Sequence, residues 1–417
     1  MVRRGLPSGR CPGHVRPGRR GAACQNRRVT DTARAEVTDP AKLLDGYRAG
    51  EFAFATPERT LLAVGADREL TGTDVVALDD ALPAEFATAA TPIAVGVLPF
   101  GDSAPARLTI PSHFHCTGPA HAAMAGRPDR VLSAPARMIA VPSEQQHQEA
   151  VAEAVRLLRQ GQLNKVVLAR ALDVTFHAPV DPAALLHNLV SGNPTGFTFA
   201  APLPGPRSAT LIGSTPELLV RRVGNRVFAH PHAGTAPRSS DPVEDADNAA
   251  RLVASSKERT EHALVVEAVV EALRPFCRSM SVPAEPSLTS TPAVWHLGTA
   301  ITGELSESGS DASALRLAAA LHPTPAVCGT PTAAARELAE KLEPFDRDYY
   351  AGAVGWVDAA GDGEWAVSIR CAEVDGERMR LYAGGGIVAA SDPAAELAET
   401  SAKFATLLRA LGITATA

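Results

Sequence analysis

Three strand-type segments near the end of the chain limit most strongly what it can fold into. Residues 350–359, 364–374 and 378–388 are short, mostly apolar runs, and Asp-Gly dipeptides at 362–363 and 375–376 supply tight-turn residues between them. Strands joined by such short turns pair in the antiparallel direction. Because strand-type segments also outnumber helical ones elsewhere, we expect an α+β fold rather than a doubly wound parallel sheet.

Capping signals place helices between these strands. Ser143 followed three residues later by Gln146 forms a capping box, and Asp392 followed by Pro393 is a typical helix start. Apolar residues that recur every three or four positions after these starting points indicate that the helices continue. The predicted helices are 143–161, 244–276, 312–321, 332–342 and 392–410.

The first 28 residues contain eight arginines and no acidic residue, unlike the rest of the chain. They lack the continuous apolar region that a secretory signal requires. We expect residues 1–35 to be a disordered, Arg-rich leader and residues 36–417 to form a single domain. An arm that binds an anionic partner is the alternative.

The overall composition excludes several classes of protein. A formal net charge of −6 gives no electrostatic footprint for nucleic acid, and no apolar run approaches the ~18 residues of a membrane span. The six cysteines are scattered without a Cys-x-x-Cys pair, which favours reduced thiols over disulfides or a zinc site. We therefore expect a cytoplasmic protein with no nucleic-acid or membrane partner.

Lys165 stands at the head of the apolar run in QLNKVVLAR, residues 162–170. Because strand residues alternate between faces, its side chain shares a face with Val167 and Ala169. Burial of an unpaired ammonium at such a position is costly. A lysine at a strand end whose amine reaches water is the ordinary explanation, and a chemical role is the other.

Two predicted helices carry glutamates at the same spacing. Glu396, Glu399 and Lys403 fall on one face of the last helix, and Glu258 and Glu261 form a second Glu-x-x-Glu pair. Mg²⁺ is typically held by one or two carboxylates, with water and substrate completing its octahedron. The two pairs together are a candidate magnesium site. Solvated charged faces, with an i,i+4 pair between Glu399 and Lys403, are the alternative.

Three further segments are candidates for ligand binding. The run Ala-Gly-Gly-Gly at 383–386 ends a strand, and its backbone can approach a ligand closely. Thr235 adds a hydroxyl at the end of HPHAGT, and Arg370 can clamp a carboxylate through two hydrogen bonds. Tight-turn glycines and a solvent-exposed arginine are the alternatives. No GxGxxG sequence joins a strand to a helix, and no Walker A sequence is present, so nothing indicates a nucleotide site.

A series of motifs occurs along roughly residues 140–410: NKVVLAR, GSTPELLV, AGTAPR, SSKERTEH, LHPTPAVCGTP, EPFDRDYYAGAVGW, SIRCAEV, AGGGIV and ELAETSAK. In this order they resemble the chorismate-utilising enzymes, and specifically the isochorismate synthases. The resemblance implies a catalytic domain with a core of antiparallel sheets flanked by helices. It also implies chorismate as substrate and Mg²⁺ as cofactor.

The resemblance assigns roles to individual residues. It implies that Lys165 is the base for the water that adds at ring C2, and that Glu217 is the acid that protonates the departing C4 hydroxyl. A lysine in a dry cleft can act as a base because desolvation disfavours its ammonium form, and burial suits a carboxyl group to act as an acid. The other implied roles are metal binding by Glu261, Glu399, Glu258 and Glu396, and substrate binding by Thr235, Arg370, Gly384, Gly385 and Lys403.

The product and the pathway are left open by this resemblance. Salicylate synthases, which go on to eliminate pyruvate, share Lys165, Glu217 and the metal site, although HPTPA at 322–326 is more similar to the isochorismate synthases. A non-catalytic chorismate-binding relative has no reason to keep these groups together, and an ammonia-using enzyme with an amidotransferase subunit should lack the lysine. We therefore expect an isochorismate synthase without that subunit. Its product would feed the biosynthesis of catecholate siderophores, menaquinone or salicylate. A monomer is a separate expectation, which the residues do not decide.

Overall fold

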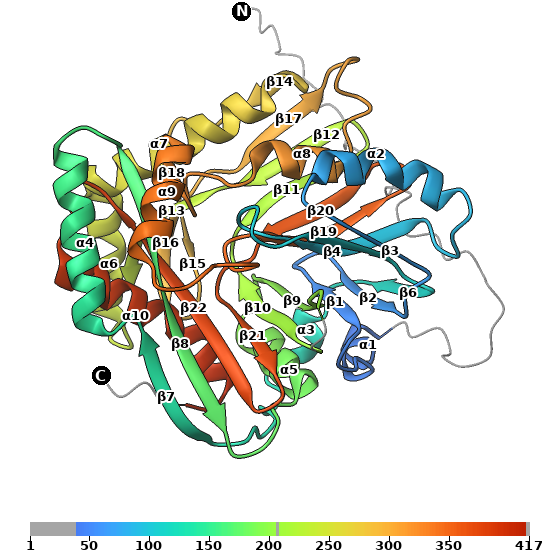
Figure 1. Ribbon diagram of the computed structural model, residues 1–417, viewed down its shortest axis with the longest axis horizontal. Helices are drawn as coiled ribbons and strands as arrows, with labels where there is room; N and C mark the ends of the chain where they lie inside the picture. Colours follow the sequence, from blue (N-terminus) through green and yellow to red (C-terminus); the bar gives the residue numbers. More distant parts are fainter. Residues whose placement is uncertain (1–38, 206–207, 414–417) are drawn as a thin grey trace, which may run out of the picture. The chain divides into compact units, whose positions relative to one another are not determined.

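The computed structural model describes residues 39–205 and 208–413, so the predicted leader at 1–35 lies outside the described residues. Within the described part, two large sheets and a three-stranded sheet are built from antiparallel strand pairs. Helices pack against these sheets (Figure 1). The predicted α+β fold with an antiparallel core is confirmed.

The first large sheet has the strand order β18-β8-β22-β21-β10-β9-β1-β2-β6, and β7 also pairs with β8. The second has the order β14-β17-β12-β11-β20-β19-β4-β5-β3, and the third is β13-β16-β15. The first sheet comprises β18 (Gly329–Thr330), β8 (Lys165–Phe176), β22 (Arg378–Ile387), β21 (Cys371–Asp375), β10 (Thr210–Thr215), β9 (Phe197–Pro202), β1 (Phe52–Ala55), β2 (Thr60–Val64), β6 (His113–Thr117) and β7 (Pro135–Val141). The second comprises β14 (Cys277–Ser281), β17 (Ile301–Leu305), β12 (Arg226–His230), β11 (Leu218–Val223), β20 (Gly363–Val367), β19 (Ala353–Asp358), β4 (Ile93–Leu98), β5 (Ala106–Ile110) and β3 (Arg68–Gly72). The third comprises β13 (His232–Pro237), β16 (Val294–Gly298) and β15 (Ser287–Ser290).

The helices lie against the sheets: α10 packs on β22, α9 on β8 and α7 on β13. In the described ranges, no helix is long and apolar enough to span a membrane. Their bounds are α1 (Pro40–Asp45), α2 (Val75–Phe86), α3 (His121–Met124), α4 (Glu144–Arg159), α5 (Pro182–Gly192), α6 (Pro242–Ala254), α7 (Ser256–Leu273), α8 (Ala314–Leu321), α9 (Thr332–Leu342) and α10 (Pro393–Ala410).

Strand side chains alternate between two apolar clusters. Along β1, Phe52 and Phe54 belong to a cluster that also contains Trp356 of the second large sheet, whereas Ala53 and Ala55 belong to a cluster on the opposite face. The second cluster includes buried residues of α5 and α10. The first large sheet is therefore covered by the second sheet on one face and by helices on the other, as the period of two in a strand requires.

The prediction of one helix over 244–276 is wrong. This segment forms two helices, α6 and α7, which meet at Ser255. Ser255 has an extended backbone, with φ −70° and ψ 114°, and its hydroxyl accepts a hydrogen bond from the Glu258 backbone N–H at 3.3 Å. The hydroxyl satisfies one of the unpaired N–H groups of the new helix. Glu258 and Glu261 consequently lie near the start of α7.

The prediction of one strand over 364–374 is also wrong. The segment forms β20 in the second large sheet and β21 in the first, and residues 368–370 cross between them. Arg370 has a φ of +52°, in the left-handed region that costs energy for a residue with a side chain. Such backbone strain is concentrated at functional sites, and Arg370 is one of the predicted site residues.

Candidate active site

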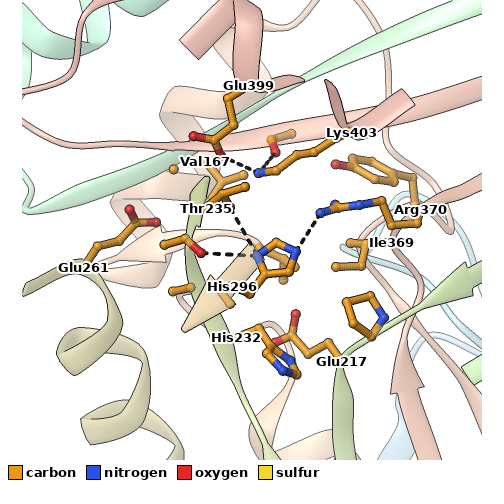
Figure 2. A pocket seen from close by; sticks show the side chains of 18 residues that line it. Val167, Glu217, His232, Thr235, Glu261, His296, Ile369, Arg370, Glu399 and Lys403 are labelled. Atoms are coloured by element: carbon orange, nitrogen blue, oxygen red, sulfur yellow. Dashed lines mark hydrogen bonds and ion pairs between the residues drawn. The ribbon is translucent and has the colours of Figure 1, made fainter. Parts of the chain in front are cut away.

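The predicted site residues meet where the chain crosses between the two large sheets. Glu217 lies between β10 of the first sheet and β11 of the second, and Arg370 lies on the return crossing from β20 to β21. The two crossings are joined by hydrogen bonds of 3.1 Å from the Val367 N–H to the Glu217 carbonyl and from the Ser214 N–H to the Arg370 carbonyl. The backbone therefore holds Glu217 and Arg370 at one pocket, which Figure 2 shows from close by.

Many of the predicted residues line this pocket, and the others lie directly behind it. Glu258 is one of those behind: it accepts a hydrogen bond from the Thr235 backbone N–H at 3.2 Å. The predicted residues that line the pocket are Glu217, Thr235, Glu261, Arg370, Gly384, Glu399 and Lys403, whereas Lys165, Glu258, Gly385 and Glu396 do not line it.

Lys165 is fully buried, so the hypothesis of a strand-end lysine whose amine reaches water is wrong. Its Nζ lies 2.9 Å from Oε1 of Glu261 on α7, an ion pair that offsets part of the cost of burial, although the contact is not aligned as a hydrogen bond. Gly386 of β22 leaves room for the pair. A Cβ at that position would lie 2.2 Å from Glu261 Oε1 and 2.9 Å from Lys165 Cε. The partner of Lys165 is thus a predicted metal ligand.

Glu217 is a buried acid. Burial raises its pKa from the usual value to about 7, although the positive charge of Lys165 and a hydrogen bond from the His232 backbone N–H act in the opposite direction. Desolvation dominates because a carboxylate loses more by burial than these groups return. Near neutral pH a large fraction of Glu217 is therefore protonated, as a proton donor must be.

Arg370 is buried, so the hypothesis of a solvent-exposed arginine is wrong. Its Nη2 donates to Nε2 of His296 at 3.0 Å, while Nδ1 of the same ring lies 3.2 Å from the Gly234 carbonyl and from Thr235 Oγ1. The pKa of His296 lies well below its usual range, mainly because the ring is buried and also because the positive charge of Arg370 is close. We infer a neutral ring with its proton on Nδ1, since Nε2 must accept from the guanidinium.

Lys403 provides a second buried cation at the pocket. Its Nζ donates to the Gly384 carbonyl at 2.8 Å and pairs with Glu399 Oε1 at 2.6 Å, so the predicted i,i+4 pair forms, although on a buried face. Gly384 cannot be replaced without displacement of a neighbour, because a Cβ there would lie 2.7 Å from the Tyr350 hydroxyl. Arg370 and Lys403 together suit a ligand with two negative charges.

The four predicted metal-binding glutamates are paired with three lysines. Glu396 retains an unpartnered, buried Oε2, and its pKa is raised to about 7 by burial and by the negative charge of Glu399. The pKa of Glu258 is raised by burial and by Glu261. The ion pairs are Lys165–Glu261, Lys257–Glu258, Lys257–Glu396 and Lys403–Glu399.

These residues fit a divalent cation by their chemistry. Among the described residues, no group of three or more His, Cys, Asp or Glu side chains is placed so that it could hold a metal ion. Mg²⁺, however, needs only one or two protein carboxylates when water and substrate supply the other oxygens. Glu261 and Glu399 both line the pocket, and the mutual repulsion among the carboxylates would be relieved by added positive charge.

Several lining residues were not predicted from the sequence. His296 and His232 are buried at the pocket, and Val167, Val327 and Tyr350 form its apolar side. A single histidine in an alternating strand, such as His296 in β16, carries no local signal of function. Tyr350 lies in a motif quoted for the family resemblance, which was the only available indication.

Comparisons with known proteins agree with this geometry. A family model described as chorismate binding enzyme matches residues 123–412. The isochorismate synthase DhbC of Bacillus subtilis is 43% identical over 389 residues, which are 90% of this chain and 97% of that protein.

Two solved structures have the same fold. DhbC of Bacillus anthracis has a TM-score of 0.85 and 43% identity, covering 90% of this chain and 100% of that one. MenF, the menaquinone-specific isochorismate synthase of Escherichia coli, has a TM-score of 0.75 and 26% identity, and the match covers 89% of this chain and 91% of that one. The predicted resemblance is confirmed: this chain belongs to the family of chorismate-binding enzymes.

Proposed function

We propose that this protein is an isochorismate synthase, an isomerase that adds water at ring C2 of chorismate while the C4 hydroxyl leaves. One observation carries the proposal: the buried acid Glu217, with a pKa of about 7, shares a pocket with the buried cations Arg370 and Lys403, and the amine of Lys165 is close enough to lower that pKa. The relatives named isochorismate synthase support the same reaction.

Arg370 and Lys403 are assigned to the two carboxylates of chorismate. Both cations are largely desolvated, which strengthens their attraction to a dianion. The Thr235 hydroxyl and the Gly384 backbone, which both line the pocket, would fix the ligand's orientation, because a backbone without a side chain admits close contact. Gly385, assigned to substrate binding with them, lies behind the pocket wall. The apolar side of the pocket faces the ring and excludes water.

Lys165 and Glu217 are assigned to the two proton transfers. Lys165 takes a proton from the water whose oxygen bonds to C2. The two conjugated ring double bonds each shift by one position, from C1=C2 to C1=C6 and from C5=C6 to C4=C5, and the C4 oxygen leaves with its bonding electrons and the Glu217 proton as water. Water enters and water leaves, so substrate and product are isomers. Lys165 can accept that proton only when its amine is neutral. Glu261, which forms an ion pair with Lys165, then needs another positively charged partner.

Glu261 and Glu399 are proposed to hold Mg²⁺, with Glu258 and Glu396 placed behind them to orient bound water. When bound, the ion would neutralise the ring carboxylate and the surrounding glutamates. The surplus of buried carboxylates over lysines supports this assignment.

Removal of either ligand should abolish turnover without unfolding the protein. We expect Glu261→Ala and Glu399→Ala each to lose activity at millimolar Mg²⁺, and EDTA to silence the wild type until Mg²⁺ is restored. Glu267→Ala is the matched control, because Glu267 lies on the same helix as Glu261 but is exposed. Isothermal titration with Mg²⁺ and thermal melts would accompany the rate measurements. Near-normal turnover in either alanine variant would remove that residue from the metal site.

The product decides between this function and its nearest alternative. Chorismate incubated with the protein and Mg²⁺ should give isochorismate on chromatography. Salicylate with released pyruvate would identify a salicylate synthase, and unconverted chorismate that nevertheless raises the melting temperature would identify a non-catalytic binder.

The biological setting is part of the proposal. We propose a cytoplasmic monomer that acts without an amidotransferase subunit, which gel filtration with light scattering would test. The relatives divide between pathways, since one structure is menaquinone-specific and others are DhbC proteins. Siderophore, menaquinone and salicylate biosynthesis therefore all remain candidate destinations of the product.

A further inference from the structure

A buried ion pair lies behind the apolar side of the pocket. The side chains of Arg347 and Glu343 are each 3% exposed. Arg347 Nε donates to Glu343 Oε2 at 2.9 Å, and Nη2 donates to Oε1 at 2.5 Å. The guanidinium also lies over the ring of Phe100, with 4.4 Å to its centroid. The catalytic assignments above leave this pair, which belongs to the motif EPFDRDYYAGAVGW, without a role.

The remaining bonds of the pair reach the pocket wall. Arg347 Nη1 donates to the Val327 carbonyl at 2.8 Å, and Nη2 donates to the Val167 carbonyl at 2.7 Å. Glu343 Oε1 accepts from the Ala169 backbone N–H at 2.7 Å. One guanidinium thereby joins β8 to the segment that carries Val327. Both valines line the pocket.

The two sides of this junction differ in how firmly they are otherwise held. Strand β8 is fixed by its pairing with β22 over its whole pocket end, from Val166 to Ala169. On the other side, Cys328 to Thr330 are also tied to β8, since the Cys328 carbonyl accepts from the Val167 N–H at 2.9 Å and β18 pairs with β8. Val327 itself precedes this pairing and lies in a turn, where its N–H donates to the Thr324 carbonyl at 3.1 Å. Loss of the Arg347 bonds would therefore move Val327 rather than Val167.

We propose that Arg347, held by Glu343, is a positioning residue for substrate: it fixes the Val327 segment against β8 and so sets the width of the apolar side of the pocket. The inference rests on the proposed function. Lysine cannot replace arginine here, because the guanidinium makes four hydrogen bonds in a fixed plane, two to the Glu343 carboxylate and one to each carbonyl, whereas an ammonium has three N–H donors on a single nitrogen. The Val327 side chain is apolar and lines the pocket, so it can offer a ligand only apolar contact, and its position should affect binding more than proton transfer.

Arg347→Lys tests the proposal through a split between KM and kcat. We expect KM for chorismate to rise by about 10-fold or more, the usual effect of a poorly fitted apolar pocket, while kcat changes by less than about 3-fold, because binding common to ground and transition states is lost. Arg380→Lys is the matched control. Arg380 of β22 forms a bidentate pair with Asp173 of β8, and neither residue lines the pocket, so KM should not change.

Glu343→Gln provides a second variant if Arg347→Lys folds poorly. It keeps the shape of the side chain, should raise KM in the same way, and should add little to Arg347→Lys in the double variant, because both act through one junction. A wild-type KM in Arg347→Lys, or an equal rise in Arg380→Lys, would overturn the proposal.

Hydrogen exchange of the free protein separates this inference from the proposed reaction. The backbone amides of Val327 and Cys328 both donate to the Thr324 carbonyl. Their exchange should be at least about 10-fold faster in Arg347→Lys than in the wild type, and should keep the wild-type rate in Arg380→Lys. This readout needs no substrate. If the wild type failed to convert chorismate, the proposed function would fall while faster exchange would still establish the junction, and unchanged exchange would refute it.

Discussion

Replacement of Lys165 by alanine is expected to lower kcat/KM for isochorismate formation by at least ~10²-fold, the usual scale for removal of a general base. The amine is fully buried beside Glu261, where water cannot substitute for it readily. Binding should survive, because Arg370 and Lys403 keep their positions on other elements. The melting-temperature shift produced by chorismate measures that binding.

A cavity and an unpaired Glu261 are side effects of the alanine variant, and Lys165→Met controls for the first. Methionine keeps most of the volume but removes the amine, so it should be as inactive as alanine while closer to the wild type in stability. If either variant retained normal turnover with intact folding, Lys165 would be only the structural partner of Glu261.

Glu217→Gln is expected to lower the rate by a similar factor of at least ~10² while making the protein no less stable at alkaline pH. Burial raises the pKa of Glu217 from 4.5 to about 7, so the folded protein binds this proton more tightly than the unfolded chain does. That contribution to stability is complete below pH 4.5 and is lost as the pH rises to about 7. Glutamine never ionises, so the variant should melt at or above the wild-type temperature at pH 8.

Glu364→Gln is the matched control for this prediction. Burial likewise raises the pKa of Glu364 to about 7, but Glu364 lies between Arg59 and Arg221 and does not line the pocket. The Glu364→Gln variant should therefore change the pH dependence of stability and leave the reaction rate unchanged. A loss of rate in Glu364→Gln equal to that in Glu217→Gln would show that neutralising any buried acid is harmful.

The wild-type pH profile follows from the same pKa. Only protonated Glu217 can donate, so kcat/KM should fall as the pH rises above about 7. The charge of Lys165 lowers the pKa of Glu217. In Lys165→Ala that pKa should therefore be higher, and the fall of the residual activity with rising pH should begin at a higher pH than in the wild type. A profile flat from pH 6 to 9 would remove Glu217 from the acid role.

Local signals predicted well what local chemistry decides. The capping box at Ser143 and the Asp392-Pro393 start are confirmed at α4 and α10, because the capping groups are neighbours in the sequence. The break at Ser255 was missed because SSKERTE contains neither proline nor glycine to end the first helix, and the Ser-x-x-Glu start pattern at 255–258 was overlooked inside a continuous helical run. The division of 364–374 between two sheets was missed because sheet membership depends on distant partners.

The same distinction holds for the site. The Glu-x-x-Glu pairs were recognisable because i,i+3 spacing puts both carboxylates on one helix face. The partner of Lys165 was not, because Glu261 lies on a helix far along the chain. His296 was missed for the same reason: its role comes from contacts with Arg370 and Gly234, and neither is near it in the sequence.

The reaction itself is tested most directly by the source of the new hydroxyl. Chorismate would be incubated with the wild-type protein and Mg²⁺ in H₂¹⁸O, and the products analysed by chromatography and mass spectrometry. Because Lys165 is assigned to activate water for attack at C2, the account predicts isochorismate that carries one ¹⁸O atom, without release of pyruvate. Unlabelled isochorismate, or salicylate with pyruvate, or no conversion at all would contradict it.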